Sequence, residues 1–133
     1  MTKRDHKELL RYLRRVADEM ELRDWTLTLS DNPAPNDAYG HMTETYGRKL
    51  AVIEVCSDFR ELDAKKQRHT IVHELVHCHL ASPTNMVLND LEKELSDTAD
   101  RIFWASYKRQ IEYSTDALAS AISKHLPLID WPK

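Results

Sequence analysis

The chain has 133 residues and a formal net charge of −3, with 31% charged and 41% hydrophobic residues. This balance excludes a disordered chain and fits one folded domain, and the small net charge gives no reason to expect nucleic acid or a membrane surface as a partner. No apolar run is long enough to cross a bilayer. The two cysteines, Cys56 and Cys78, and a charged N-terminus without a signal peptide lead us to expect a cytoplasmic protein with free thiols.

The first predicted element is an amphipathic helix from about residue 2 to residue 22. Leu9, Leu13, Val16 and Met20 recur at helical spacing, so this helix should pack on a core. Its other face mixes basic and acidic residues, which favours a solvated surface. A regulator that contacts DNA through this helix is the weaker alternative.

Three short segments with β-forming residues follow, at 25–29, 39–46 and 50–56. A proline-rich loop at 32–37 separates the first two, and the two glycines of the chain bracket most of the second. Short connections favour antiparallel neighbours. We therefore expect an α+β fold with a small, mostly antiparallel sheet of three strands.

The second half of the chain is predicted to be helical. Asp63 is a plausible N-cap for a helix that runs to about Leu80 and ends at Ser82–Pro83. Residues 84–126 contain neither glycine nor proline and keep a helical stripe of apolar residues. This stretch predicts one or two long helices closed by Pro127, followed by a short irregular tail.

The first of these helices contains the stretch His73-Glu74-Leu75-Val76-His77. Residues four apart lie on one face of a helix, so His73 and His77 can both reach a single ion, for which zinc is the usual choice. Glu74 would lie beside the ion, where it can act as a general base on zinc-bound water. The alternative is a solvated helix face that carries two histidines by chance.

A catalytic zinc ion normally has three protein ligands, so a third one is needed. The extended pattern H-E-x-x-H-x-x-G-x-x-H fails, because Leu80 and Pro83 stand where its glycine and histidine would be. His69 shares the face of His73, and we interpret it as a residue at the rim of a cleft. Three other possible donors are less well placed: His79, His125 and Cys56.

A later helix offers a better donor. Glu112 and Asp116 are four residues apart, which suits Glu112 as a metal ligand and Asp116 as the acceptor that holds a ligating histidine ring. Glu92 and Glu94 are nearer in sequence, but neither has a carboxylate four residues further on. We interpret those two as part of a solvated helix face.

The order H-E-x-x-H and then E-x-x-x-D on a later helix is similar to the gluzincin pattern of thermolysin-like zinc peptidases. More closely, the chain resembles the small phage-encoded and prophage-encoded minigluzincins, with a leading helix, a short sheet with a tryptophan in its first strand, and two closing helical segments. The resemblance spans nearly the whole chain and is most specific at 70–80 and 111–127. It implies a single zincin-like domain over residues 1–133.

The resemblance also implies a site and an activity. Carried over by position, it gives His73, His77 and Glu112 as ligands of one zinc ion, Glu74 as general base and Asp116 as support for a ligand. The implied activity is that of a zinc metalloendopeptidase, which hydrolyses peptide bonds in a peptide or protein substrate.

The chain departs from the larger gluzincins in two ways. The sequence separation between His77 and Glu112 is longer, and there is no large second domain to form the other side of the cleft. The small size keeps open an alternative from another class, a zinc-stabilised binding or regulatory module with little or no catalytic activity. The group that would steady the oxyanion is also open, with four candidates: Tyr39, His41, Tyr46 and Tyr107.

Overall fold

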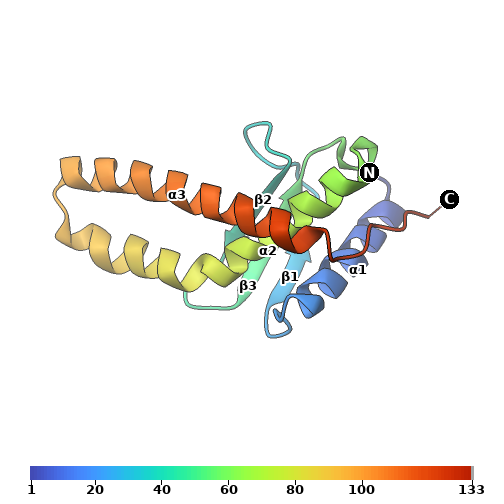
Figure 1. Ribbon diagram of the computed structural model, residues 1–133, viewed down its shortest axis with the longest axis horizontal. Coiled ribbons are helices and arrows are strands. Elements are labelled where there is room, and N and C mark those ends of the chain that lie inside the picture. Colours follow the sequence, from blue (N-terminus) through green and yellow to red (C-terminus); the bar gives the residue numbers. More distant parts are fainter. Residues whose placement is uncertain (133) are drawn as a thin grey trace.

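The computed structural model describes residues 1–132 and confirms the α+β class in a single domain. Three helices and three strands dominate it (Figure 1). Among the described residues, no helix combines the length and the apolar character that a membrane span requires. In chain order the elements are α1 (Lys3–Glu19), β1 (Thr26–Leu29), β2 (Gly40–Glu44), β3 (Leu50–Val55), the 3-10 turn η1 (Phe59–Glu61), α2 (Ala64–Met86) and α3 (Asp97–Ser123).

The sheet is mixed, so the prediction of mostly antiparallel neighbours is wrong. Its strand order is β1-β3-β2, with β2 antiparallel to β3 and β1 parallel to β3. The physical reason is that β3 takes the centre, where Ala51, Ile53 and Val55 bury one face of the most apolar strand. The strand β2 is therefore left at an edge of the sheet, with no strand on its outer side.

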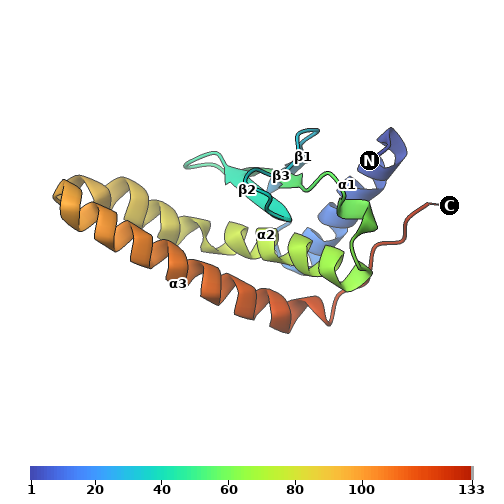
Figure 2. The ribbon, with the colours of Figure 1, turned by 90° about the horizontal axis from the view of Figure 1, so that it is seen from above.

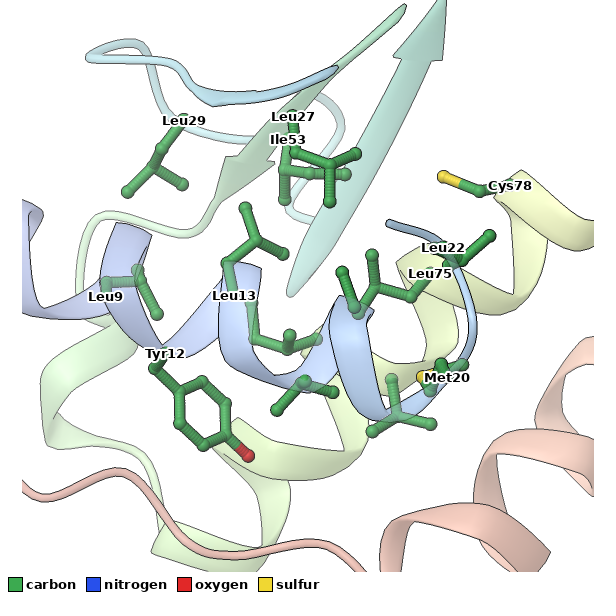
Figure 3. Packing of buried hydrophobic residues seen from close by; sticks show 14 of the residues in the cluster. Leu9, Tyr12, Leu13, Met20, Leu22, Leu27, Leu29, Ile53, Leu75 and Cys78 are labelled. Carbon is green, nitrogen blue, oxygen red and sulfur yellow. The ribbon is translucent and has the colours of Figure 1, made fainter. Parts of the chain in front are cut away.

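One face of the sheet packs on α1 and α2 and forms the core. Leu9 and Leu13 of α1, Ile53 of β3 and Leu75 of α2 are completely buried there (Figure 3). Figure 2 shows α2 lying between the sheet and α3. The helix α2 is thus covered on two opposite sides, which explains why Ile71, Val72, Leu75 and Val76 in its middle are buried.

The start of α2 is as predicted, but its end is not. The side chain of Asp63 caps the helix by accepting hydrogen bonds from the backbone N–H groups of Lys65 (2.9 Å) and Lys66 (3.3 Å). The predicted end at Ser82–Pro83 is wrong, because the helix continues through Pro83 to Met86. A proline removes one helical hydrogen bond, and here α3 packs along α2 and supports the continuation.

Two tighter or wider turns follow α2, a π turn η2 (Val87–Leu91) and a 3-10 turn η3 (Glu92–Glu94). The helical conformation then ends at Leu95, which is extended. The Ser96 side chain caps α3 by accepting a hydrogen bond from the backbone N–H of Ala99 (3.4 Å). Residues 84–126, for which one or two long helices were predicted, thus contain one long helix, α3, preceded by the last residues of α2 and the two short turns.

The tail is irregular, as predicted, but it is tied to the core. The Tyr12 hydroxyl donates to the Pro127 carbonyl (2.8 Å), and the indole N–H of Trp131 donates to the Gln67 side chain (3.0 Å). These bonds fix the end of α3 against α1 and the first turns of α2. The position of α3 along α2 is consequently set at this end.

Candidate metal centre

Both histidines of the predicted motif lie on the side of α2 that faces α3. Their side chains are 16% exposed at His73 and 20% exposed at His77, so both are largely buried but still reach the surface. The two Nε2 atoms are 3.2 Å apart, with the rings in an edge-on arrangement. One helical turn separates the residues, and this spacing allows both nitrogens to point at one position.

The helix α3 places Glu112 opposite this pair. Its Oε2 is 3.3 Å from His73 Nε2 and its Oε1 is 3.2 Å from His77 Nε2. Ligands that bind zinc at about 2.0–2.1 Å with tetrahedral angles are separated from one another by about 3.3–3.4 Å. The three side chains therefore form a triangle in which each of these three atom pairs has about the spacing of zinc ligands, with His73 and His77 contacting different oxygens of the Glu112 carboxylate. One zinc ion held by these three residues would leave a fourth position for water or substrate.

Asp116 lies one turn after Glu112 and orients a histidine ring. Its Oδ1 is 2.9 Å from His73 Nδ1. When Nδ1 donates its proton to this carboxylate, Nε2 of the same ring keeps its lone pair, which then points into the triangle. The arrangement selects the tautomer that can bind a metal ion through Nε2.

His69, expected at the rim of a cleft, lies beside the same carboxylate. Its Nε2 is 3.9 Å from Asp116 Oδ1, and His69, His73 and Asp116 form a second group of donors close enough to surround an ion. Burial, and then the charge of His73, lower the pKa of His69. This second group shares His73 with the triangle, so the two groups are parts of one cluster.

The Glu74 carboxyl group lies against the sheet, close to Gly40 of β2. Glu74 is only 5% exposed and packs beneath the start of β2. A Cβ atom at Gly40 would lie 2.7 Å from Glu74 Oε1 and 2.8 Å from the Thr70 methyl group, so only glycine permits this close approach. Burial, and then the negative charge of Glu112, raise the pKa of Glu74 to about 8.

A cleft of about 280 Å³ connects these groups. It runs between the start of β2 and the facing sides of α2 and α3. Its lining includes Glu74 of α2 and Glu112 and Asp116 of α3. The other residues of its lining are Ala38, Tyr39, Gly40, Lys66, His69, Thr70 and His73. The cleft thus has the unpaired edge of the sheet as one wall and the metal donors as another.

Of the four candidates for oxyanion support, Tyr39 lines this cleft, with its ring under the Lys66 ammonium group (4.0 Å to the ring centre). His41 instead bonds to Glu54 on β3 (3.2 Å). Tyr46 borders a different depression, near the end of α1, and Tyr107 shares a hydrogen bond with Thr84 (3.2 Å). The geometry therefore favours Tyr39 among the four.

The alternative donors lie elsewhere. Cys78 is buried in the core, as expected, and burial raises the pKa of its thiol to about 12. His79 donates from Nε2 to the Met20 carbonyl (2.8 Å) and so ties α2 to the end of α1. The cleft residues that the sequence analysis missed are Gly40, Lys66 and Thr70. A glycine inside a strand is a signal of close approach, and Gly40 could have been found in this way.

The chain was compared with models of known protein families, with curated proteins and with solved structures. None of the three comparisons found a match. What is known of the site therefore comes from its own geometry, namely the triangle of His73, His77 and Glu112 and the buried carboxyl group of Glu74.

Proposed function

We propose that this protein is a zinc-dependent peptidase. The observation that carries the proposal is the triangle of His73, His77 and Glu112. The two Nε2 atoms are 3.2 Å apart, and each lies 3.2–3.3 Å from one oxygen of the Glu112 carboxylate, which is close to the ligand spacing of tetrahedral zinc. Two imidazoles and one carboxylate are also a donor set that suits zinc better than magnesium or calcium. The open fourth corner is what a catalytic site, as opposed to a structural one, requires.

Zinc in this position would lower the pKa of a water molecule and polarise the carbonyl group of a peptide bond. Glu74 supplies the proton transfer: it takes a proton from the attacking water and returns it to the amine that leaves. The pKa of about 8 applies to the metal-free protein. A zinc cation beside this carboxyl group would lower the pKa, and the ionised carboxylate could then accept the proton. Asp116 holds the ring of His73, and Tyr39 lines the cleft and is our candidate for support of the developing oxyanion.

The edge of β2 suggests how a substrate would lie. The Tyr39 carbonyl accepts from Cys56, and the Thr45 N–H donates to Leu50, so the main-chain groups of these residues face β3. Main-chain groups alternate in direction along a strand, so those of Gly40 and Met42 face away from β3. An extended peptide can pair with such an edge, and we propose that the substrate does so beside Glu74.

The experiment that tests this proposal is the cleavage of an unbiased peptide mixture by the zinc-loaded protein. We expect cleavage that a chelator abolishes, and a loss of about 10²-fold to 10⁴-fold in Glu74→Gln, because the general base is gone. Zinc content should be unchanged in that variant. Glu92→Gln, at an exposed position distant from the cleft, is the matched control and should cleave normally. Retained turnover in Glu74→Gln would contradict the assigned role.

A zinc-stabilised binding module is the second candidate, and one observation favours it. Glu112 and Asp116 have side chains that are 53% and 62% exposed, so the site is open to water on the side of α3. Hydrolases generally exclude bulk water when they act. Stoichiometric zinc without chelator-sensitive cleavage of any peptide would favour this second function.

A further inference from the structure

A depression lies at the other end of β2 from the cleft, and we call it the distal depression. It has a volume of about 700 Å³ and lies between the turn after β2, the connection from α1 to β1 and the last turns of α2. Glu44, the last residue of β2, lines it. Gly40, the first residue of the strand, lines the cleft. The cleft and the distal depression are therefore at opposite ends of one strand.

Glu44 faces α2, as Gly40 does. Side chains alternate along a strand, so Gly40, Met42 and Glu44 share one face of β2. The close approach of Gly40 to Glu74 identifies this face as the one toward α2. Burial, and then the negative charge of Glu44, raise the pKa of the Cys78 thiol on α2, which agrees with this direction. The register partners of the three residues on β3 are all buried on the same side: Val55, Ile53 and Ala51.

Glu44 also turns its main-chain groups toward the free edge of β2, because it continues the alternation of Gly40 and Met42. Cross-strand neighbours in a sheet have their side chains on the same face, and directly opposite Cβ atoms are about 4.5–5.5 Å apart. A peptide that pairs with this edge therefore places one side chain beside that of Glu44. Opposite charges in such a pair attract each other, and like charges repel.

The charges around the distal depression favour a cation beside Glu44. Lys49 is already paired with Asp24. Within residues 1–132, Glu44 forms no ion pair. Apart from the Lys49–Asp24 pair, the lining has three acids and one base: Glu21, Glu44, Asp90 and Arg48. The balance is negative, so a basic side chain suits this position and an acidic one does not.

The apolar part of the lining gives a second reason, which does not depend on the acids. Trp25 and Tyr46 both line the distal depression, and aromatic faces attract cations. Met86 lines it as well and is 60% exposed. The long side chains of lysine and arginine lay their methylene groups on apolar surface and keep the charged end free. Such a side chain can contact the rings, the methionine and Glu44 at once.

We infer that Glu44 is a specificity residue, which selects substrates with lysine or arginine about four residues from the cleaved bond. The inference rests on the proposed peptidase function and on the pairing of the substrate with β2. The cleaved bond lies beside Glu74, next to Gly40, and Glu44 lies about 13 Å further along the strand. Glu44 acts by contact with the substrate at a distance from the reacting atoms.

Cleavage of an unbiased peptide mixture by the zinc-loaded protein, with sequencing of the products, tests this inference. At low ionic strength we expect lysine and arginine to exceed glutamate and aspartate about fivefold at one position, roughly four residues from the cleaved bond. The preference should shrink in high salt, because the charges are partly exposed. Glu44→Lys should reverse the preference. Thr43→Lys is the matched control: it adds the same charge to the opposite face of β2 and should keep the wild-type preference.

A binding measurement separates this inference from the peptidase function. Labelled alanine-based peptides with lysine or glutamate at each position in turn are added to zinc-loaded Glu74→Gln, and fluorescence anisotropy gives their affinities. Lysine peptides should bind more tightly, and adding Glu44→Lys to this variant should reverse the order. Binding of this kind without any cleavage by the wild-type protein would contradict the peptidase and support the inference. Cleavage whose preference Glu44→Lys does not change, or the absence of both cleavage and binding, would overturn the inference.

Discussion

The same two helices, α2 and α3, serve two different purposes along their length. At the root they bring His73, His77 and Glu112 together, and α2 is anchored there by completely buried residues such as Leu75. In their distal part, residues 82–114, which we call the hairpin, no residue is fully buried. A polar cluster needs rigid support to hold its geometry, whereas an uncovered apolar surface indicates contact with another molecule. One pair of helices therefore has a rigidly supported polar cluster at its root and an exposed apolar surface in the hairpin.

The largest effect that distinguishes the two regions should be on stability. Leu75→Ala removes a completely buried side chain and should lower the free energy of unfolding by about 2–5 kcal/mol. Leu91→Ala makes the same change at a residue that is 38% exposed and should cost less than about 1 kcal/mol. Urea unfolding measures both losses. Equal losses would mean that the hairpin is part of the same cooperative core.

Gly40→Ala should affect turnover at the root while leaving the hairpin unchanged. The new methyl group would lie 2.7 Å from Glu74 Oε1, so the carboxyl group must move. A displacement of about 1 Å in a reacting group can reduce the rate roughly 10²-fold. Steady-state cleavage assays should show this loss with zinc affinity intact. Thr43→Ala, on the same strand, is the control, and normal activity in Gly40→Ala would count against the position of Glu74.

Asp116→Ala should weaken zinc binding about 10-fold to 100-fold, because the ring of His73 loses the acceptor that fixes its orientation. Competition with a chelating dye measures the affinity. Asp97→Ala, on the same helix at the tip of the hairpin, is the matched control. If the two variants bind zinc equally well, Asp116 does not support the ligand.

Stability of the metal-free protein should depend on pH through Glu74. Its pKa is raised from 4.5 to about 8 by burial and by Glu112, so the folded state holds the proton more tightly than the unfolded state. This contribution to stability is lost as pH rises toward 8. Burial is the main cause of the lowered pKa values of His69 and His77. These two groups make stability rise with pH, but only below their unfolded pKa of about 6.5.

Of these three groups, only Glu74 changes the stability between pH 6.5 and 8. The melting temperature should therefore fall across this interval. Glu74→Gln has no titrating group at this position, so its melting temperature should change less. Scanning calorimetry of both metal-free proteins makes the comparison. A wild-type curve as flat as that of the variant would mean that Glu74 is ionised in the folded protein.

Local patterns were sufficient to predict the helices, the three strand segments and the Asp63 cap, because each depends on residues close in sequence. Local patterns failed where contacts between distant segments determine the structure. The central place of β3 depends on which strand buries best, and the continuation of α2 through Pro83 depends on packing against α3. Neither can be read from periodicity alone.

The same distinction holds for the site. Spacing by four residues predicts that His73 and His77 share a face and that Glu112 and Asp116 share another. Whether the two faces meet is a property of the folded chain, and in the structure they do. A glycine inside a strand indicates a close approach, but that Gly40 approaches Glu74 depends on the distance between a strand and a helix, which no local pattern contains.

The central claim is that His73, His77 and Glu112 bind one zinc ion, and X-ray absorption at the zinc edge tests it most directly. The zinc-loaded protein should show about four nitrogen and oxygen neighbours at roughly 2.0–2.1 Å, with outer-shell scattering from two imidazole rings and no sulfur. Glu112→Ala should remove one oxygen neighbour or release the ion. A sulfur neighbour at about 2.3 Å, or a spectrum that Glu112→Ala does not change, would contradict the claim.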